Sequence, residues 1–82
     1  MDYKRGMIVK SAAGHDKGYF FVVLSFDEQY AVICDGRHRL LEKPKRKKWK
    51  HLFPTNKAVM ESLMVSNRQI RKALANFQKS LM

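Results

Sequence analysis

One short segment carries much of the positive charge of this sequence. Residues 37–50 contain eight of the seventeen Lys and Arg residues and a single acidic residue, Glu42. Cations at this density suit a polyanion, and each phosphate that they neutralise adds about 0.9 to the slope of log affinity against log salt concentration. Charge runs are often only solvated faces or flexible tails. Because Pro44 and Trp49 interrupt this run and predicted strands flank it, we interpret it as a structured ridge that contacts phosphates.

The candidate contact residues form two groups. The first group lies in this segment and in a loop that precedes it: Lys17, Arg37, Arg39, Lys45, Arg46, Lys47, Lys48 and Lys50. The second group comprises further basic or aromatic residues: Lys10, His15, Trp49, Arg68, Arg71 and Lys72. The first group makes one site only if the fold brings the loop alongside the basic segment.

That loop, residues 14–18, combines turn formers with a cation. Gly14 and Gly18 would let the backbone approach a ligand, turn N–H groups can form an anion-binding concavity, and Lys17 adds charge. The same glycines also suit a plain strand connection that requires a positive φ. We favour this simpler role for the glycines and phosphate contact for Lys17, and we expect His15 to donate to phosphate or to face water.

Two aromatic residues next to cations leave alternatives open. Trp49 lies between Lys48 and Lys50, and its ring could stack on an unpaired base or pack under the sheet. Stacking contributes about 1–3 kcal/mol per base where it occurs. Trp is highly buried on average, which favours the core position. Tyr19 directly follows the loop and poses the same alternative.

No pattern in the sequence indicates a metal site or a catalytic centre. Cys34, His38 and His51 come nearest to a ligand set, but their spacing matches no structural zinc pattern. A Ser-His-Asp order, paired carboxylates, a Walker loop and a dinucleotide-type glycine pattern are also lacking. We therefore expect no enzyme activity, no metal, no cofactor and no small-molecule substrate.

The charge of the whole chain also favours a polyanionic partner. The 82 residues make one domain with 45 % hydrophobic residues, a formal net charge of +10 and a pI near 10.1. A domain pI above about 9 is expected of a nucleic-acid binder. The single cysteine, Cys34, excludes an intrachain disulfide and lies in an apolar run typical of the core. Because the sequence has neither a signal peptide nor an apolar run of ~20 residues, we expect a cytoplasmic protein without a membrane partner.

The elements that would position these residues are mostly short strands. Four runs of apolar, β-branched or aromatic residues predict strands, of which the second is central and partly buried on both sides. These runs cover residues 7–9, 19–27, 30–34 and 38–42. Asp35 and Gly36 form a strong hairpin signal before the fourth strand. A short fifth strand is expected to end at residues 52–53, because Pro54 stops it.

The last part of the chain is predicted to be helical. Ser66 and Gln69 form a capping box. An apolar stripe follows at helical spacing, consisting of Ile70, Ala73, Leu74, Phe77 and Leu81. Apolar residues over 58–64 suggest one or two earlier helical turns. Five short strands with short connections predict a mainly β fold, a small antiparallel barrel, with the helix covering one end or side.

The first part of the sequence resembles a KOW motif. Residues 6–10, 14–18 and 19–23 match its alternation of polar and apolar residues around a glycine, here Gly18, followed by a β-strand. KOW motifs occur in ribosomal proteins and in transcription elongation factors.

The resemblance continues along nearly the whole chain. Residues 34–37 and 41–48 are similar to segments of large-subunit ribosomal proteins of the fourteen-e group, and residues 50–52 and 66–74 to parts of their short bacterial KOW-domain relatives. This resemblance implies a five-stranded SH3-like barrel over residues 1–54, followed by a helical tail over the remainder, 55–82. It also implies binding to ribosomal or other structured RNA.

The sequence thus predicts a basic RNA-binding protein of the translation apparatus, in a ribonucleoprotein with ribosomal RNA and with ribosomal proteins as further partners. Selectivity would come from RNA shape rather than base sequence. One alternative is a protein-interaction module that docks on the transcription or translation machinery, with Ile70, Leu74 and Phe77 seating the partner. Another is nonspecific binding of duplex DNA, which predicts equal affinity for DNA and RNA of like charge.

Overall fold

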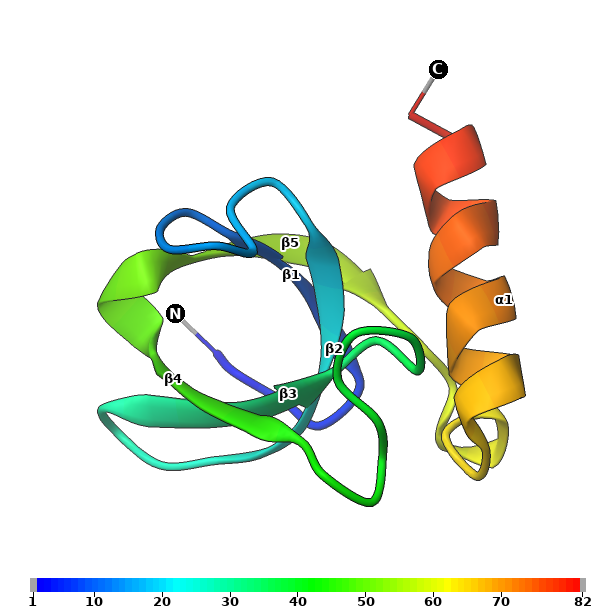
Figure 1. The fold of residues 1–82 in the computed structure, drawn as a ribbon, viewed down its shortest axis with the longest axis horizontal. Coiled ribbons are helices and arrows are strands. Elements are labelled where there is room, and N and C mark those ends of the chain that lie inside the picture. The colour runs from blue at the N-terminus through cyan, green and yellow to red at the C-terminus, as the bar shows by residue number, and fades with distance from the viewer. Residues whose placement is uncertain (1, 82) are drawn as a thin grey trace.

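A computed structural model, which describes residues 2–81, forms a curved antiparallel sheet with a helix beside it (Figure 1). Within this range there are five strands in the order β4-β3-β2-β1-β5, which are β1 (Met7–Ser11), β2 (Phe20–Phe26), β3 (Tyr30–Cys34), β4 (Lys45–Lys48) and β5 (Leu52–Ala58). The other elements are two 3₁₀ turns and one helix, namely η1 (Trp49–His51), η2 (Glu61–Leu63) and α1 (Asn67–Lys79). The prediction of a mainly β fold with five antiparallel strands and a C-terminal helix is confirmed.

The central strand, β2, is buried on both faces of the sheet, as its sequence predicted. Phe21, Val22 and Val23 are fully buried. Phe21 and Val23 belong to a first core cluster inside the curve of the sheet, which consists of Met7, Val9, Phe21, Val23, Ala31, Ile33, Trp49 and Leu52. Val22 belongs to a second cluster under the helix, which consists of Ile8, Val22, Cys34, Val59, Met64, Ile70 and Leu74. The sheet therefore has a hydrophobic core cluster on each of its two faces.

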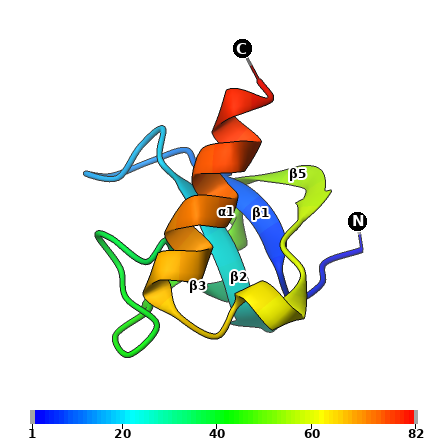
Figure 2. The same ribbon diagram turned by 90° about the vertical axis from the view of Figure 1, so that its right-hand side faces the viewer.

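Helix α1 lies across the outer face of the sheet (Figure 2). It begins as predicted, because the Ser66 side chain accepts a hydrogen bond from the Gln69 backbone N–H (3.2 Å). Ile70 and Leu74 are buried against the sheet, and the Phe77 ring meets the Phe20 ring edge to face at 5.2 Å between centroids. Ile70, Leu74 and Phe77 of the apolar stripe thus pack within the chain, whereas Leu81 at its end is exposed.

The predicted fourth strand over residues 38–42 is wrong. One Asp35 carboxylate oxygen accepts the backbone N–H groups of Arg37, His38 and Arg39 at 2.8–2.9 Å, and this holds the segment in a tight loop. The edge strand forms seven residues later, at Lys45–Lys48, and pairs with β3 from Tyr30↔Lys48 to Ile33↔Lys45. The basic run itself is therefore a strand.

The fifth strand does not stop at Pro54, as the sequence predicted. β5 continues to Ala58 at the edge of the sheet, with Pro54 opposite Val9. An edge strand tolerates proline because one side of its backbone needs no partner. Next to Pro54, the Thr55 hydroxyl donates to the Ile8 carbonyl (2.6 Å) and so supplies a hydrogen bond to β1. The helical turns expected over residues 58–64 reduce to the single turn η2; nearby, Val59 and Met64 are buried.

Candidate nucleic-acid interface

A buried ionic cluster joins the loop of residues 14–18, which we call the glycine loop, to the basic strand β4. The Lys47 ammonium donates to Asp16 Oδ1 (2.6 Å), to Ser11 Oγ (2.7 Å) and to the Ala13 carbonyl (2.6 Å). Ser11 Oγ also donates to Asp16 Oδ1 (2.6 Å), and Lys45 Nζ lies 3.1 Å from Asp16 Oδ2. We call Ser11, Asp16, Lys45 and Lys47 the Asp16 cluster. It fixes the loop of residues 14–18 alongside β4.

The charge of Asp16 is stabilised in this cluster. Burial by itself would raise the pKa of Asp16, but hydrogen bonds from Lys47, Ser11 and Lys45 outweigh it and hold that pKa well below its ordinary value of 3.8. Asp16 is therefore a carboxylate at neutral pH. The charge of Lys47 is balanced inside the protein.

Two lysines of the predicted ridge, Lys45 and Lys47, are engaged within the Asp16 cluster. Lys47 is only 8 % exposed, and its three N–H donors already have three oxygen acceptors, so it has none left for a phosphate. Lys45 is half-buried and paired with Asp16. Successive strand side chains point to opposite faces. Lys45 and Lys47 therefore point to the Asp16 side, whereas Arg46 and Lys48 point to the other side.

The other face of β4 presents its cations to solvent. The exposed Arg46 guanidinium lies 3.7 Å from the centre of the Tyr30 ring, and the exposed Lys48 ammonium lies 5.8 Å from it. We call Arg46, Lys48 and Tyr30 the outer basic face. Lys50 follows in η1 and is also exposed. Stacking on Tyr30 orders the Arg46 side chain while its charge stays accessible.

Trp49 is a core residue, which is the alternative that its sequence favoured, and its enclosed position gives no support to the predicted contact with RNA. Its ring is 8 % exposed and stacks on Tyr3 at 3.7 Å with a 5° interplanar angle. Its Nε1 donates to the Asp27 carbonyl (2.9 Å), and Phe26 packs against it edge to face. Because Tyr3 already stacks on the ring and the rest of the side chain is enclosed, no base can stack there. This position follows from the tendency of Trp to be buried with its N–H paired.

The loop of residues 35–39, which we call the Asp35 loop, is held together by the Asp35 carboxylate. Besides its three backbone N–H bonds, Asp35 contacts His38 Nδ1 through Oδ2 (3.0 Å). Burial would raise the pKa of Asp35, but the bonds from Arg39, Arg37 and His38 lower it, so the carboxylate stays charged. The imidazole of His38 stacks on Tyr19 at 4.7 Å and 18°. This contact brings the residue after Gly18 against the loop that carries Arg37 and Arg39.

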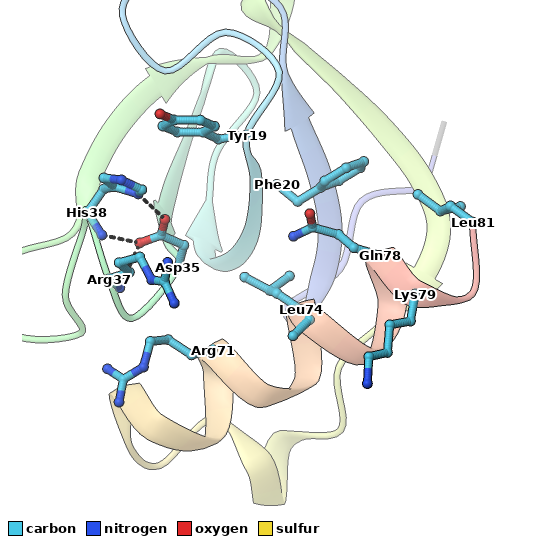
Figure 3. A pocket seen from close by; sticks show the side chains of 11 residues that line it. Tyr19, Phe20, Asp35, Arg37, His38, Arg71, Leu74, Gln78, Lys79 and Leu81 are labelled. Carbon is cyan, nitrogen blue, oxygen red and sulfur yellow. Dashed lines mark hydrogen bonds and ion pairs between the residues drawn. The ribbon is translucent and has the colours of Figure 1, made fainter.

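An open groove of about 640 Å³ lies between this loop and α1 (Figure 3). Tyr19 and His38 lie on one side of it, and Arg71 and Leu74 project from the helix on the other. The Arg71 guanidinium donates to the Gly36 carbonyl (2.7 Å) and ties the two walls together. The sequence did not reveal this groove. The only signal was Tyr19, an aromatic residue placed directly after a basic turn.

The remaining candidates are spread over other surfaces. His15 and Lys17 are exposed on the glycine loop, and Arg68 and Lys72 are exposed on α1. Lys10 is exposed on β1, where its ammonium lies 5.7 Å from the centre of the Phe20 ring, next to the groove. The structure therefore brings the glycine loop into contact with β4, and Tyr19, which follows that loop, into contact with His38.

In comparisons with known proteins, no protein-family model and no curated protein sequence matches this chain. Within residues 2–81, no helix is long and apolar enough to cross a membrane. In the same part of the chain, no three His, Cys, Asp or Glu side chains are grouped as a metal site would need. Cys34 is buried in the second core cluster, and this burial raises the pKa of its thiol to about 11.

Proposed function

We propose that this chain is a cytoplasmic KOW-domain protein that binds structured RNA, with ribosomal RNA as its foremost target, in the translation apparatus. In this proposal the curved sheet is an SH3-like barrel. Two features support that interpretation. The outer strands of the sheet, β4 and β5, follow each other in the chain with only η1 between them. The first core cluster also draws together residues from four of the strands, including Leu52 of β5 and Ile33 of β3.

The observation that carries the proposal is the Asp16 cluster. It pairs Lys45 and Lys47 with the single carboxylate of Asp16 and, in doing so, fixes the glycine loop against β4. Lys17 on that loop remains exposed, and so do Arg46 and Lys48 on the other face of β4. A basic surface on a rigid framework binds phosphates at a lower entropic cost than a flexible tail would. RNA of defined shape is its natural partner, because phosphate contacts position a nucleic acid without reading its bases.

Fluorescence anisotropy with a labelled RNA hairpin tests this proposal. Affinity is measured between about 50 and 200 mM salt, a range over which several phosphate contacts give a steep loss. Charge reversal of the outer basic face, Arg46→Glu with Lys48→Glu, should weaken binding and lower the log–log salt slope by about 1.5, since two contacts at about 0.7–0.9 each are removed. Reversal of Lys47 is avoided because it would disrupt the Asp16 cluster.

A charge-matched control separates local contact from net charge. Lys4→Glu with Lys57→Glu changes the net charge equally at two exposed sites that belong to neither the loop nor β4. This control should retain most of the affinity and the full salt slope. The proposal fails if hairpin binding is insensitive to salt, or if the outer-face variant binds as tightly as its control.

Two further experiments determine which kind of nucleic acid the protein binds. Equal affinity for a DNA hairpin and an RNA hairpin of the same length would indicate general duplex binding instead. Crosslinking in cells, followed by sequencing of the bound RNA, should recover ribosomal RNA fragments as the enriched class. Recovery of unrelated transcripts in proportion to their abundance would contradict a role in the translation apparatus.

A further inference from the structure

The groove between the Asp35 loop and α1 has the features of a binding site that the outer basic face lacks. It is concave, and its volume of about 640 Å³ lies within the range of about 300–1,000 Å³ that is usual for small-ligand sites. Its walls come from three separate parts of the chain, represented by Tyr19, His38 and Arg71 (Figure 3). Nothing in the proposed phosphate-binding surface of β4 uses these residues.

The chemistry of the groove is cationic on the rim and aromatic on one wall. Arg37, Arg71 and Lys79 line it, and in the described part of the chain none of the three has an acidic side-chain partner. Asp35 is the only acidic lining residue within residues 2–81, but it is 8 % exposed and its two oxygens are taken by backbone N–H groups and His38. The groove therefore presents positive charge to a ligand.

The aromatic wall is exposed and already ordered. Tyr19 is 45 % exposed, and its stack with His38 fixes the orientation of its ring before any ligand arrives. The floor is apolar, with Phe20 and Leu74 among the lining residues. A ligand with a flat ring and an attached phosphate could stack on the aromatic wall, pack against the apolar floor and pair with the cations of the rim. An extended acidic peptide would satisfy only the cations.

We propose that this groove binds one unpaired nucleotide of a structured RNA, with its base stacked on the Tyr19–His38 wall and its phosphates beside Arg37 and Lys79. The inference rests on the RNA binding proposed above and adds the class of RNA, a helix interrupted by a bulge or loop. A base inside a continuous helix cannot enter, because its faces are already stacked. Lys17 lies two residues before Tyr19, so the glycine loop and this wall of the groove adjoin each other in the chain.

Two labelled RNA duplexes of identical sequence, one with a single bulged adenosine at its centre, test the proposal by fluorescence anisotropy. The protein should bind the bulged duplex about 5- to 150-fold more tightly, the ratio that corresponds to stacking of about 1–3 kcal/mol per base. Tyr19→Ala should abolish this preference while leaving affinity for the plain duplex unchanged. Tyr19→Phe should keep it, because the ring remains.

A second variant guards against an indirect effect of Tyr19→Ala. His38→Ala removes the other ring of the wall and should also reduce the preference, and circular dichroism should show that both variants remain folded. Equal affinity for the two duplexes, with salt-sensitive binding to both, would overturn the nucleotide groove and leave the proposed function intact. Binding to neither duplex would overturn the proposed function itself. Competition by an acidic peptide against the bulged duplex alone would assign the groove to a protein segment and overturn the inference.

Discussion

Lys47 and Asp16 are 31 positions apart in the chain, yet Lys47 Nζ lies 2.6 Å from Asp16 Oδ1 with the lysine almost completely buried. A lysine is rarely enclosed unless its charge is paired. Here the pairing connects the turn between β1 and β2 to the edge strand β4. The most basic stretch of the sequence thus contains a residue whose hydrogen-bond donors are all used within the fold.

Loss of this pair should destabilise the protein strongly. Lys47→Ala leaves Asp16 enclosed with only Lys45 and Ser11 as partners, and removal of one member of a buried ion pair costs about 3–5 kcal/mol. Because Lys45 remains, we expect the free energy of unfolding, measured by urea titration, to fall by about 3 kcal/mol, near the lower end of that range. Lys48→Ala on the outer basic face is the matched control and should change the free energy of unfolding by no more than about 0.5 kcal/mol. Equal stability of the two variants would contradict the structural role of Lys47.

The Asp16 cluster also shows where sequence patterns stop being informative. The first three strands and the capped helix were predictable because apolar periodicity and the Ser66 cap are local signals. β4 has no apolar signal of its own, since its four residues are all Lys or Arg. What makes it a strand is its pairing with β3 and the bonds of Lys47 to residues more than thirty positions away.

The predicted fourth strand failed for the opposite reason. Leu40 and Leu41 gave an apolar signal, but the Asp35 carboxylate captures the preceding backbone N–H groups and turns the chain into a loop. Pro54 likewise predicted a strand end, and only the position of β5 at the sheet edge makes the proline acceptable. For the candidate site, charge density marks residues 37–50 as the most basic segment of the sequence. It could not separate the buried Lys47 from the exposed Arg46, because strand register decides which side chain points inward.

Stability should fall in acid with a contribution from Asp16. Above its ordinary pKa of 3.8, Asp16 is ionised in the folded and unfolded states, and its partners stabilise the folded one. Folding lowers the pKa of Asp16, so below about pH 4 this residue takes up a proton in the unfolded chain before it does so in the folded one. The free energy of unfolding therefore declines as the pH falls from about 4 toward the folded-state pKa. One such group gives a slope of up to about 1.4 kcal/mol per pH unit.

Urea unfolding at a series of pH values from neutral to about pH 3, where unfolded carboxylates protonate, measures this slope. Asp16→Asn should be less stable than the natural protein at neutral pH and should lose less stability on acidification. Some acid dependence should remain in the variant, because the pKa of Asp35 is also lowered on folding. Parallel curves for the two proteins would rule out a contribution from Asp16.

Two glycines offer a paired test of how α1 is held. Gly36 has a φ of 75°, and a Cβ there would come 2.3 Å from the Asn67 carbonyl oxygen at the start of the helix. Gly18 has a φ of 91°, but a Cβ there would meet nothing within 4 Å. Each alanine substitution incurs the backbone strain of about 1–2 kcal/mol for an L-residue in this region, and only Gly36→Ala adds a clash with the helix.

We therefore expect Gly36→Ala to lower the free energy of unfolding by clearly more than Gly18→Ala does. The excess should be local, because the clash pushes the Asp35 loop away from Asn67 and weakens the bond between Arg71 and the Gly36 carbonyl. Hydrogen exchange of the α1 amides should accelerate in Gly36→Ala and remain close to the natural rate in Gly18→Ala. Since the groove has one wall on each of these elements, Gly36→Ala should also lose the preference for the bulged duplex while it still binds the plain duplex. Unchanged exchange in α1 would mean that the helix is held by its apolar face alone, and that the close approach of Gly36 does not contribute.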